Sequence, residues 1–422
     1  MNASLYFFYK ENGEEHMKIC TFKGGIQPNG RKELTKDKEI VTVLPQEELV
    51  FPLSRSGKIS AFPLVIEGET VCKGQKIAEE NGEEESVYAS VSGRVKAIEH
   101  RINPYGMKVN SIILENDGLY QEAEYKNEKV KVHDAAEIRF ILANLVECEP
   151  YVTSTYRRMI ENADELVGGM RVLLDKCQSA IGAFCVADDK INCVSKLKER
   201  IADTGRMEIR VIKRKYPQEN EALLALAALG KKKSKERVFL VSAEELIADY
   251  RKEITGEPIT ERVLTVSGNA VNEPGNFKVL LGTSYRTLIE AAGGLCEDVE
   301  KVISGGVMTG NTVATLDVPV TKDTDAIICM KRDMTENIAI RPCIKCGRCV
   351  EVCPKGLIPS KLAMFAEKSA EKEFIKWNGT DCIECGCCTY KCPSKRPLKQ
   401  MIAAMKQNVF ASAESEGGKY ES

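Results

Sequence analysis

The stretch that decides the fold repeats one cysteine pattern, first as Cys343-Ile-Lys-Cys346-Gly-Arg-Cys349-Val-Glu-Val-Cys353-Pro354 and then as Cys382-Ile-Glu-Cys385-Gly-Cys-Cys388-Thr-Tyr-Lys-Cys392-Pro393. Three thiolates spaced by two residues can surround one corner of an iron–sulfur cube from a tight loop. The fourth cysteine, three residues further on and followed by proline, has entered the next turn and points away. Each run therefore predicts a tight cluster-binding loop.

Both runs match the C-x2-C-x2-C-x3-C-P spacing that binds [4Fe–4S] clusters in bacterial ferredoxins, where the fourth cysteine serves the other cluster. We therefore predict two clusters with crossed ligands. One is held by Cys343, Cys346, Cys349 and Cys392, and the other by Cys382, Cys385, Cys388 and Cys353. Gly347 and Gly386 fall where the backbone passes close to cluster sulfide, an approach that glycine allows.

Two other uses of these cysteines fit the spacing less well. Zinc usually takes two Cys-x2-Cys pairs separated by a longer loop, rather than three cysteines in such a short run. Disulfides need an oxidising compartment, and the N-terminal residues carry no signal-peptide pattern. Cys387 lies inside the second run but out of its register, so we predict that it binds no iron.

The composition is that of an ordinary soluble protein of several domains. Of 422 residues, 43% are hydrophobic and 29% charged, and the net charge of −2 leaves no electrostatic footprint for nucleic acid. No run of about eighteen apolar residues is present, so we expect no transmembrane segment, and docking on a membrane complex stays open. The nine cysteines that we do not predict as cluster ligands are scattered without pairing spacings, which predicts a cytoplasmic, anaerobic setting.

Changes of pattern along the chain divide it into six segments. We predict an extension or weak strand at 1–17, a carrier-like β barrel at 18–130, an α/β domain at 131–255, a β-grasp module at 256–332, a two-cluster ferredoxin domain at 333–406 and a flexible tail at 407–422. The predicted fold class is a multidomain α/β and α+β protein with a helical, ferredoxin-like C-terminal domain.

The barrel is predicted from short apolar runs punctuated by glycine turns. Gly68-Glu-Thr-Val-Cys-Lys-Gly-Gln75, followed by Ser92-Gly-Arg-Val95, resembles the barrel-sandwich hybrid of biotinyl and lipoyl carrier domains. A carrier needs a modifiable lysine at its exposed hairpin turn, and the corresponding turn here, residues 79–85, has none. We therefore predict a structural barrel and no swinging arm.

Residues 131–255 alternate between predicted strands and helices. Residues 180–187 and 207–212 fit buried strands, residues 157–174, 190–203 and 220–229 fit helices, and residues 135–145 fit either. Such alternation favours a parallel sheet covered by helices. Glu147 and Glu149 flank Cys148 after the first apolar run, at the kind of strand end where open α/β sheets bind ligands. A solvated loop is the alternative.

The following residues predict a small β-grasp module and the spacer between the cysteine runs. Residues 262–268 and 278–283 fit strands, and 285–292 fit a helix closed by Gly293-Gly294. The stretch Ser304-Gly-Gly-Val-Met-Thr-Gly310 is glycine-rich but does not match G-x-G-x-x-G, so it predicts nucleotide binding only weakly. Residues 359–376 fit one amphipathic helix, and residues 411–418 fit a disordered tail.

Five landmarks occur in one order: the barrel, Glu147-Cys-Glu-Pro-Tyr151, Lys215-Tyr-Pro-Gln218, the β-grasp module and the two cysteine runs. This order, over about residues 18–405, resembles the RnfC family, the peripheral NADH-side subunits of Rnf ferredoxin:NAD oxidoreductase complexes, and related soluble RnfC-like proteins. The resemblance implies an SLBB-like β-grasp module and a central domain similar to the flavin subunit of respiratory complex I. It implies FMN and NADH near Glu147 and Glu149, and two [4Fe–4S] clusters.

The sequence departs from the family pattern around the flavin site. The glycine-rich loop that precedes the family's Glu-Cys-Glu-Pro, and that lets backbone N–H groups reach a phosphate, is absent, because residues 134–144 run almost directly into Glu147. The family has a glycine where this chain has Glu219, and its Gly-Gly-Pro-Met-Met-Gly stretch corresponds here to Gly305-Gly-Val-Met-Thr-Gly310. The family's aspartate after Glu-Cys-Glu-Pro-Tyr is replaced around residues 153–155. The family's N-terminal Gln-His-x-Gly is absent at residues 54–57. These departures indicate a family member in which the cysteine motifs for electron transfer are kept and the flavin–NADH pocket is lost or remodelled.

The leading hypothesis is an RnfC-like subunit that relays electrons through two clusters within an NADH/ferredoxin-linked oxidoreductase complex. It would act as an enzyme only as part of that complex, with ferredoxin or other subunits as redox partners, on the cytoplasmic face of the membrane. The alternative is a flavin-free adaptor between a reductase and a partner, as in a soluble amino-acid reductase system. A third hypothesis, structural clusters in a DNA-linked protein, is opposed by the absence of a basic patch.

Overall fold

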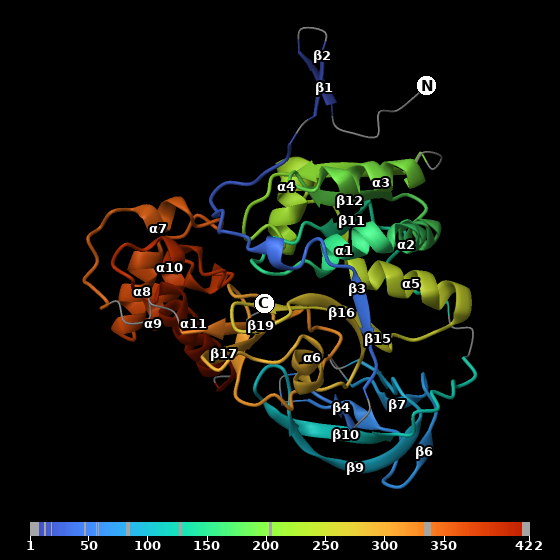
Figure 1. The fold of residues 1–422 in the computed structure, drawn as a ribbon. Coiled ribbons are helices and arrows are strands. Elements are labelled where there is room, and N and C mark those ends of the chain that lie inside the picture. The colour runs from blue at the N-terminus through green and yellow to red at the C-terminus, as the bar shows by residue number, and fades with distance from the viewer. Residues whose placement is uncertain are drawn as a thin grey trace.

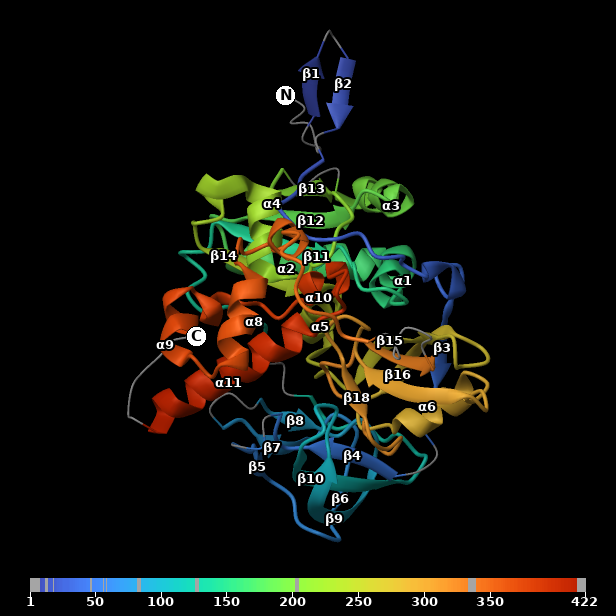
Figure 2. The same cartoon turned by 90° about the vertical axis from the view of Figure 1, so that its left-hand side faces the viewer.

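The computed structural model describes residues 8–11, 14–17, 19–45, 48–55, 57, 59–81, 85–125, 129–201, 205–332 and 339–415. Four packed regions follow one another along the chain, and the helical C-terminal region lies beside the second and third of them (Figures 1 and 2). In the described part of the chain, no helix is both long enough and apolar enough to span a lipid bilayer.

The first residues form a hairpin that stands apart from the rest of the molecule in both views (Figures 1 and 2). Strand β1 (Phe8–Glu11) pairs antiparallel with β2 (Glu14–Met17). For residues 1–17 a weak strand is the alternative prediction to an extension. Residues 8–11 and 14–17 of this segment form strands. Residues 1–7, 12 and 13 lie outside the described residues.

The β domain is built from two small sheets that enclose one apolar core. The first sheet has the order β4 (Glu48–Pro52), β10 (Lys108–Asn116), β9 (Gly93–Ile102) and β6 (Thr70–Val71), and the second the order β5 (Phe62–Pro63), β7 (Lys76–Glu79) and β8 (Val87–Tyr88). Leu49, Ile77 and Ile112 are fully buried between them. Burial of such alternating apolar side chains stabilises a sandwich of this size.

The α/β domain is a four-stranded parallel sheet with helices on both faces. Its order is β13 (Met207–Ile212), β12 (Ile181–Ala187), β11 (Phe140–Leu145) and β14 (Val238–Ser242). The helices are α1 (Ser154–Glu161), α2 (Ala163–Lys176), α3 (Ile191–Ile201), α4 (Glu221–Lys233) and α5 (Ala243–Thr255). One core lies between the sheet and α2, α3 and α5, and a second lies under α4.

The single helix predicted over 157–174 is wrong, because the chain forms α1 and α2 with a break at Asn162. Asn162 leaves the helical region of backbone conformation, with φ −119° and ψ 31°. Its side chain accepts a hydrogen bond from Arg158 and donates one to Glu165. A short amide side chain that binds its neighbours in this way competes with helix continuation.

The β-grasp module is a six-stranded mixed sheet packed on one short helix. Its order is β18 (Asn311–Val313), β17 (Val299–Ser304), β19 (Ala326–Lys331), β15 (Glu261–Gly268), β16 (Gly275–Leu280) and β3 (Ile40–Val43), and its helix is α6 (Tyr285–Ala291). Strand β3 pairs parallel with β16. Residues 40–43 therefore belong to this sheet, and the prediction that placed them in the barrel is wrong.

The C-terminal region is a group of short helices around the cysteine runs. They are α7 (Arg348–Glu351), α8 (Pro359–Glu367), α9 (Glu371–Lys376), α10 (Cys387–Lys391) and α11 (Leu398–Ser415). The helix predicted over 359–376 is broken at Ser369, which has a φ of +49°. The flexible tail predicted from residue 407 is wrong as far as Ser415, because α11 continues to there with Val409 buried, and residues 416–422 lie outside the described residues.

Candidate functional site

Five cysteines from both runs line one cradle in the C-terminal region, namely four predicted ligands of one cluster and Cys387. Cys353, the last cysteine of the first run, lies with Cys382, Cys385 and Cys388 of the second run around a small cavity closed by apolar side chains such as Leu362 and Ile402. Two of the sulfurs already accept backbone hydrogen bonds, Cys353 from Leu357 at 3.3 Å and Cys382 from Glu384 at 3.4 Å. Such N–H···S bonds are typical around cluster thiolates and tune their reduction potential. The donor set fits an iron–sulfur cluster.

The other four cysteines lie on the outer side of the same region. The backbone of Arg341 donates to the carbonyl of Ser394 at 3.0 Å, and the Ser394 hydroxyl donates to the carbonyl of Pro342 at 2.9 Å. These bonds bring the start of the first run beside the end of the second. Cys343 and Cys346 are exposed, and Cys349 and Cys392 are half-buried. That Cys392 shares a cluster with the first three cysteines of the first run stays a prediction.

Each cysteine loop has a left-handed backbone conformation at the glycine that follows its second cysteine. Gly347 and Gly386 precede α7 and α10 with φ values of +76°, a left-handed conformation that favours glycine. In the described part of the chain, no set of three or more Cys, His, Asp or Glu side chains is spaced for a single metal ion. The thiolates of a four-iron cluster bind four different irons, so they stand further apart than the ligands of one ion.

The inner cradle packs against the α/β domain. The hydroxyl of Tyr216 donates to the carbonyl of Cys385 at 2.7 Å, and the backbone of Gly25 donates to the carbonyl of Val352 at 2.9 Å. At Gly24, with φ +81°, an added Cβ would lie 2.8 Å from the carbonyl oxygen of Cys353, so only glycine fits. Cys387 is fully buried in this seam beside Ile26, Cys148 and Tyr216.

A second feature is an acidic cavity of about 400 Å³ between the α/β domain and the β-grasp module. Its lining comes from the ends of β11 and β14, the start of α1, the turn between β9 and β10, and the loops that precede α4, follow β17 and precede β19. Five carboxylates belong to it: Glu147, Glu149, Glu219, Asp323 and Asp325. No lysine, arginine or histidine is present among the described residues that line it.

Glu147 occupies the N-terminus of helix α1. Its Oε1 accepts hydrogen bonds from the backbone of Thr155 at 2.7 Å and of Tyr156 at 3.3 Å. Its Oε2 pairs with Lys190 at 3.0 Å and with Lys32 at 3.3 Å. Burial opposes ionisation of this carboxyl, but the two lysines and the backbone N–H groups outweigh burial and lower its pKa. Glu147 is therefore ionised and fills a site where a phosphate could bind.

Glu149 occupies the glycine-rich loop after β17 in the same way. It accepts from the backbone of Met308 at 3.0 Å and of Thr309 at 3.1 Å, and from the Thr309 hydroxyl at 2.6 Å. At Gly306 an added Cβ would lie 2.3 Å from the Glu149 carboxyl carbon. Burial first, and then the charge of Glu219, raise the pKa of Glu149 to about 7.

Glu219 fills the third anion-binding position of the cavity. Its carboxylate accepts hydrogen bonds from the backbone of Cys148 and, at 3.2 Å, from that of Glu149. Burial raises the pKa of Glu219, against the opposing charge of Lys32. Six backbone N–H groups at the cavity thus bind the chain's own carboxylates: those of Cys148, Glu149, Thr155, Tyr156, Met308 and Thr309. These residues do not fit the phosphate of a flavin or a dinucleotide, which would compete with the carboxylates for these donors and would meet like charge.

The acidic cavity and the inner cradle share one wall. The loop of Met308 gives its N–H group to Glu149 on the cavity side, and its carbonyl accepts from Lys399 at 3.2 Å. Lys399 lines the cradle. A group in the cavity would therefore be separated from the inner cysteines by a single loop.

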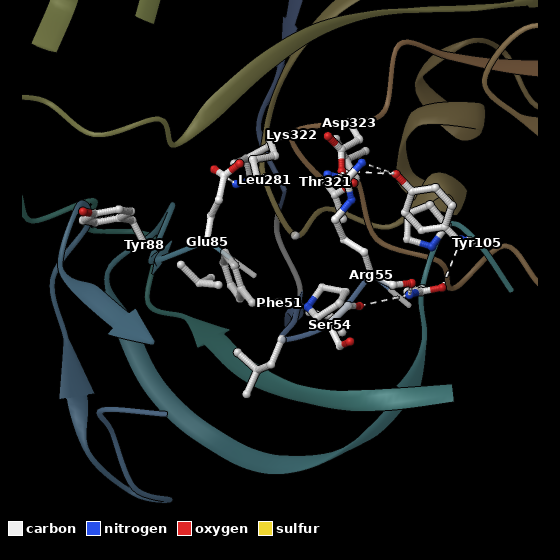
Figure 3. A pocket seen from close by; sticks show the side chains of 18 residues that line it. Phe51, Ser54, Arg55, Glu85, Tyr88, Tyr105, Leu281, Thr321, Lys322 and Asp323 are labelled. Carbon is white, nitrogen blue, oxygen red and sulfur yellow. Dashed lines mark hydrogen bonds and ion pairs between the residues drawn. The ribbon is translucent and has the colours of Figure 1, made fainter. Parts of the chain in front are cut away.

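A smaller apolar cavity of about 90 Å³ lies between the β domain and the β-grasp module (Figure 3). Tyr105 accepts a hydrogen bond from Arg55 and donates one to Asp323, both at 3.2 Å, and Arg55 pairs with Asp323 at 3.2 Å (Figure 3). The contacts join the two domains. The cavity lies at a packing seam and is lined by no cysteine.

The structure brings together most residues that the sequence singled out. Glu147 and Glu149 line the acidic cavity, while their role in a flavin pocket stays a prediction. Lys32 and Lys190, the partners of Glu147, were missed, because nothing in the local sequence marks a lysine that is buried far along the chain. Glu219 was marked only as a replaced glycine.

Four family models match consecutive parts of the chain. They are an RnfC barrel sandwich hybrid domain at residues 20–119, a Nuo51 FMN-binding domain at 118–246, an SLBB domain at 263–312 and a 4Fe-4S dicluster domain at 342–395. The predictions of a barrel-sandwich β domain, an SLBB-like module and a ferredoxin-type domain are confirmed.

Relatives match over nearly the whole chain, and each is the subunit named C of an oxidoreductase complex. The chain is 30% identical to that of the Na(+)-translocating ferredoxin:NAD(+) oxidoreductase complex of Acetobacterium woodii, over 94% of this chain and 98% of that protein. It is 30% identical to that of the proton-translocating ferredoxin:NAD(+) oxidoreductase complex of Clostridium ljungdahlii, over 95% of this chain and 96% of that protein. The corresponding protein of the ion-translocating oxidoreductase complex of Klebsiella pneumoniae is also 30% identical, over 94% of this chain and 58% of that longer protein.

Proposed function

The chain belongs to the RnfC family, and from this premise we propose that it is an electron-transfer subunit of an ion-translocating ferredoxin:NAD oxidoreductase complex. Its 4Fe-4S dicluster domain supplies the redox groups. Its partners are the other subunits of that complex, and it lies as a peripheral subunit on the cytoplasmic face of the membrane.

One observation carries this proposal: Cys353 of the first run lies with the three predicted ligand cysteines of the second run, Cys382, Cys385 and Cys388, around a single cradle. That crossed arrangement is the one by which ferredoxins hold two [4Fe–4S] clusters. The inner cluster is held by Cys353, Cys382, Cys385 and Cys388, and the outer cluster by Cys343, Cys346, Cys349 and Cys392. A [4Fe–4S] cluster held by these cysteines would supply one-electron redox chemistry.

The acidic cavity does not serve as a flavin site in this chain. Support comes from Glu147, Glu149 and Glu219, which bind the backbone donors that a phosphate would need. The matching family model is named for FMN binding, which supports the fold of this domain, and we infer that the three carboxylates take the place of the ligand in this chain.

An anaerobic absorption spectrum of the purified protein, with iron and released flavin quantified before and after NADH is added, tests these points. About eight irons per chain, no flavin and no bleaching by NADH are expected. About four irons or fewer per chain would overturn the assignment of two clusters. Bound FMN together with bleaching by NADH would leave the clusters in place and overturn the flavin-free cavity.

A further inference from the structure

A further cavity at the α/β domain is lined mostly by cations. It has a volume of about 360 Å³ and lies outside the carboxyl ends of β12 and β13, against the start of α1 and the N-terminal residues 29–36. We call it the basic cavity. Among the described residues, none lines both this cavity and the acidic cavity. Its five cations are Arg31, Lys32, Lys36, Lys190 and Arg214.

The two buried lysines of the basic cavity share one carboxylate of the chain. Lys190 and Lys32 pair with the same Oε2 of Glu147, at 3.0 and 3.3 Å. Lys190 also donates to the carbonyl of Val146 at 3.1 Å, and Lys32 donates to the carbonyl of Val152. With both lysines protonated, one carboxylate leaves this wall of the cavity with a net positive charge.

Arg31 and Lys36 carry charges that the chain compensates only weakly. Arg31 pairs with Glu33 and Lys36 with Asp37, each at 3.9 Å, and these side chains are 49% to 78% exposed. Exposed ion pairs between neighbours in the sequence contribute little. Both cations can therefore turn to an anion in the basic cavity.

Arg214 brings part of its guanidinium group to the same cavity. Its Nε lies 3.4 Å from the carboxylate of Asp189, and its Nη2 donates to the carbonyl of Pro28 at 3.3 Å. Its Nη1 has no hydrogen-bond partner among the described residues. A Cβ at Gly30 would collide with Nη2, so the glycine leaves the space that the guanidinium group occupies.

We propose that the basic cavity binds a small phosphate ester, with its phosphate held by the cations and its organic part against the ring of Tyr156. Several cations supply more charge than one carboxylate would use, and the arginine fork suits phosphate oxygens. The Tyr156 hydroxyl accepts from Asn192 at 2.8 Å and keeps its own proton to donate to the ester. The cavity has the size of a small-molecule site, and its place at strand ends is one where open α/β sheets bind ligands.

Glu147 separates this ligand from the contents of the acidic cavity. It lines the acidic cavity, while its partners Lys32 and Lys190 line the basic cavity. A phosphate on the acidic side would meet like charge, whereas on the basic side it meets cations. The proposal goes beyond electron transfer and does not depend on iron content, so its failure would leave the proposed function in place.

Calorimetric titration of the full-length, iron-loaded protein with ribose 5-phosphate tests the proposal, with ribose as the matched compound that lacks the phosphate. We expect saturable binding of ribose 5-phosphate with a dissociation constant of about 1 mM or less, and no binding of ribose. The affinity should fall about threefold or more between about 50 and about 300 mM NaCl, because salt screens exposed charges. Absence of saturable binding, or equal binding of ribose, overturns the proposal.

The double variant Arg31→Gln with Lys36→Gln should weaken this binding by about tenfold or more, because two cations of the basic cavity are lost. The matched control is Lys231→Gln with Lys232→Gln, which removes two exposed charges on α4 and should bind like the wild type. Arg214→Lys keeps the charge and loses the fork, so a smaller loss of about threefold is expected. Wild-type affinity in the Arg31 and Lys36 variant, or an equal loss in the control, overturns the proposal.

Hydrogen exchange of the same protein locates the bound ester. With ribose 5-phosphate present, exchange should slow in residues 29–36 and 213–216, which adjoin the basic cavity, and should stay unchanged in residues 304–310, which line the acidic cavity. Slower exchange confined to residues 304–310 would place the ester in the acidic cavity and would also overturn the proposal.

Discussion

The hydroxyl of Tyr216 donates a hydrogen bond to the backbone carbonyl of Cys385 across 2.7 Å, and so joins the α/β domain to the inner cysteine loop. Burial raises the pKa of this phenol far above its usual range, so Tyr216 stays a donor at every working pH. Cys387 is packed beside it, which ties the same loop to the same surface. The position of the inner cysteine loop is thus set by the neighbouring domain as well as by the loop's own sequence.

Removal of the Tyr216 hydroxyl should weaken the contact between the α/β domain and the inner cysteine loop. Tyr216→Phe is expected to lower the free energy of unfolding of the cluster region by about 1–2 kcal/mol, because the buried Cys385 carbonyl loses its donor. The electron paramagnetic resonance spectrum of the inner cluster should change with it. Urea denaturation and that spectrum check the outcome, with Tyr390→Phe as the exposed control. Equal stability of both variants would contradict a joining role for Tyr216.

Loss of Cys353 should remove one cluster and spare the other. Cys353→Ala is expected to lower the iron content from about eight to about four per chain, because the inner cradle loses one of its four thiolates. Cys387→Ala, the matched control within the second run, should keep about eight irons. Iron analysis after anaerobic reconstitution decides between them. Retention of eight irons by the Cys353 variant would disprove the crossed ligand set.

Stability should fall as the pH rises through neutrality because of Glu149. Its pKa is about 7 in the folded protein and 4.5 ordinarily, so the folded state binds more protons between these values. Its stabilising contribution is complete below 4.5 and is lost as the pH rises through 7. Between pH 6 and pH 8 the free energy of unfolding should drop by about 1.4 kcal/mol from this group.

Urea denaturation at pH 6 and pH 8 measures this drop, and Glu149→Gln should remove most of it. Glu219 titrates beside Glu149 and its pKa is also raised, so some dependence on pH should persist in the variant. An unchanged pH profile in Glu149→Gln would show that the carboxyl does not titrate in this window.

A smaller residue at position 219 should restore an anion site. Glu219→Gly frees the backbone donors of Cys148 and Glu149 and removes a carboxylate from the cavity, so FMN binding should become detectable. Glu219→Gln removes the charge but keeps the volume, and it should bind FMN no better than the wild type. Quenching of FMN fluorescence measures both. Equal FMN binding by the wild type and Glu219→Gly would show that Glu219 is no barrier.

The sequence was enough to locate several helices, but it did not show where a helix is interrupted. The apolar spacing of 157–174 continues across Asn162, and that of 359–376 continues across Ser369, so periodicity alone predicts one helix in each place. The breaks depend on side-chain bonds such as that from Arg158 to Asn162. Likewise, Val409 is buried against other helices, which keeps α11 helical where a polar composition predicts disorder.

The sequence by itself determined the cluster chemistry, because the spacing of cysteines within a tight loop is a local property that survives without knowledge of the fold. The same holds for the order of domains, which consecutive turn and strand patterns mark. Only the tertiary structure decided what fills the acidic cavity. Lys32 is separated from Glu147 by 115 residues, and Cys148 from Glu219 by 71. Whether such groups meet depends on how sheets and helices pack, since burial and the satisfaction of backbone donors act between segments that are distant in the chain.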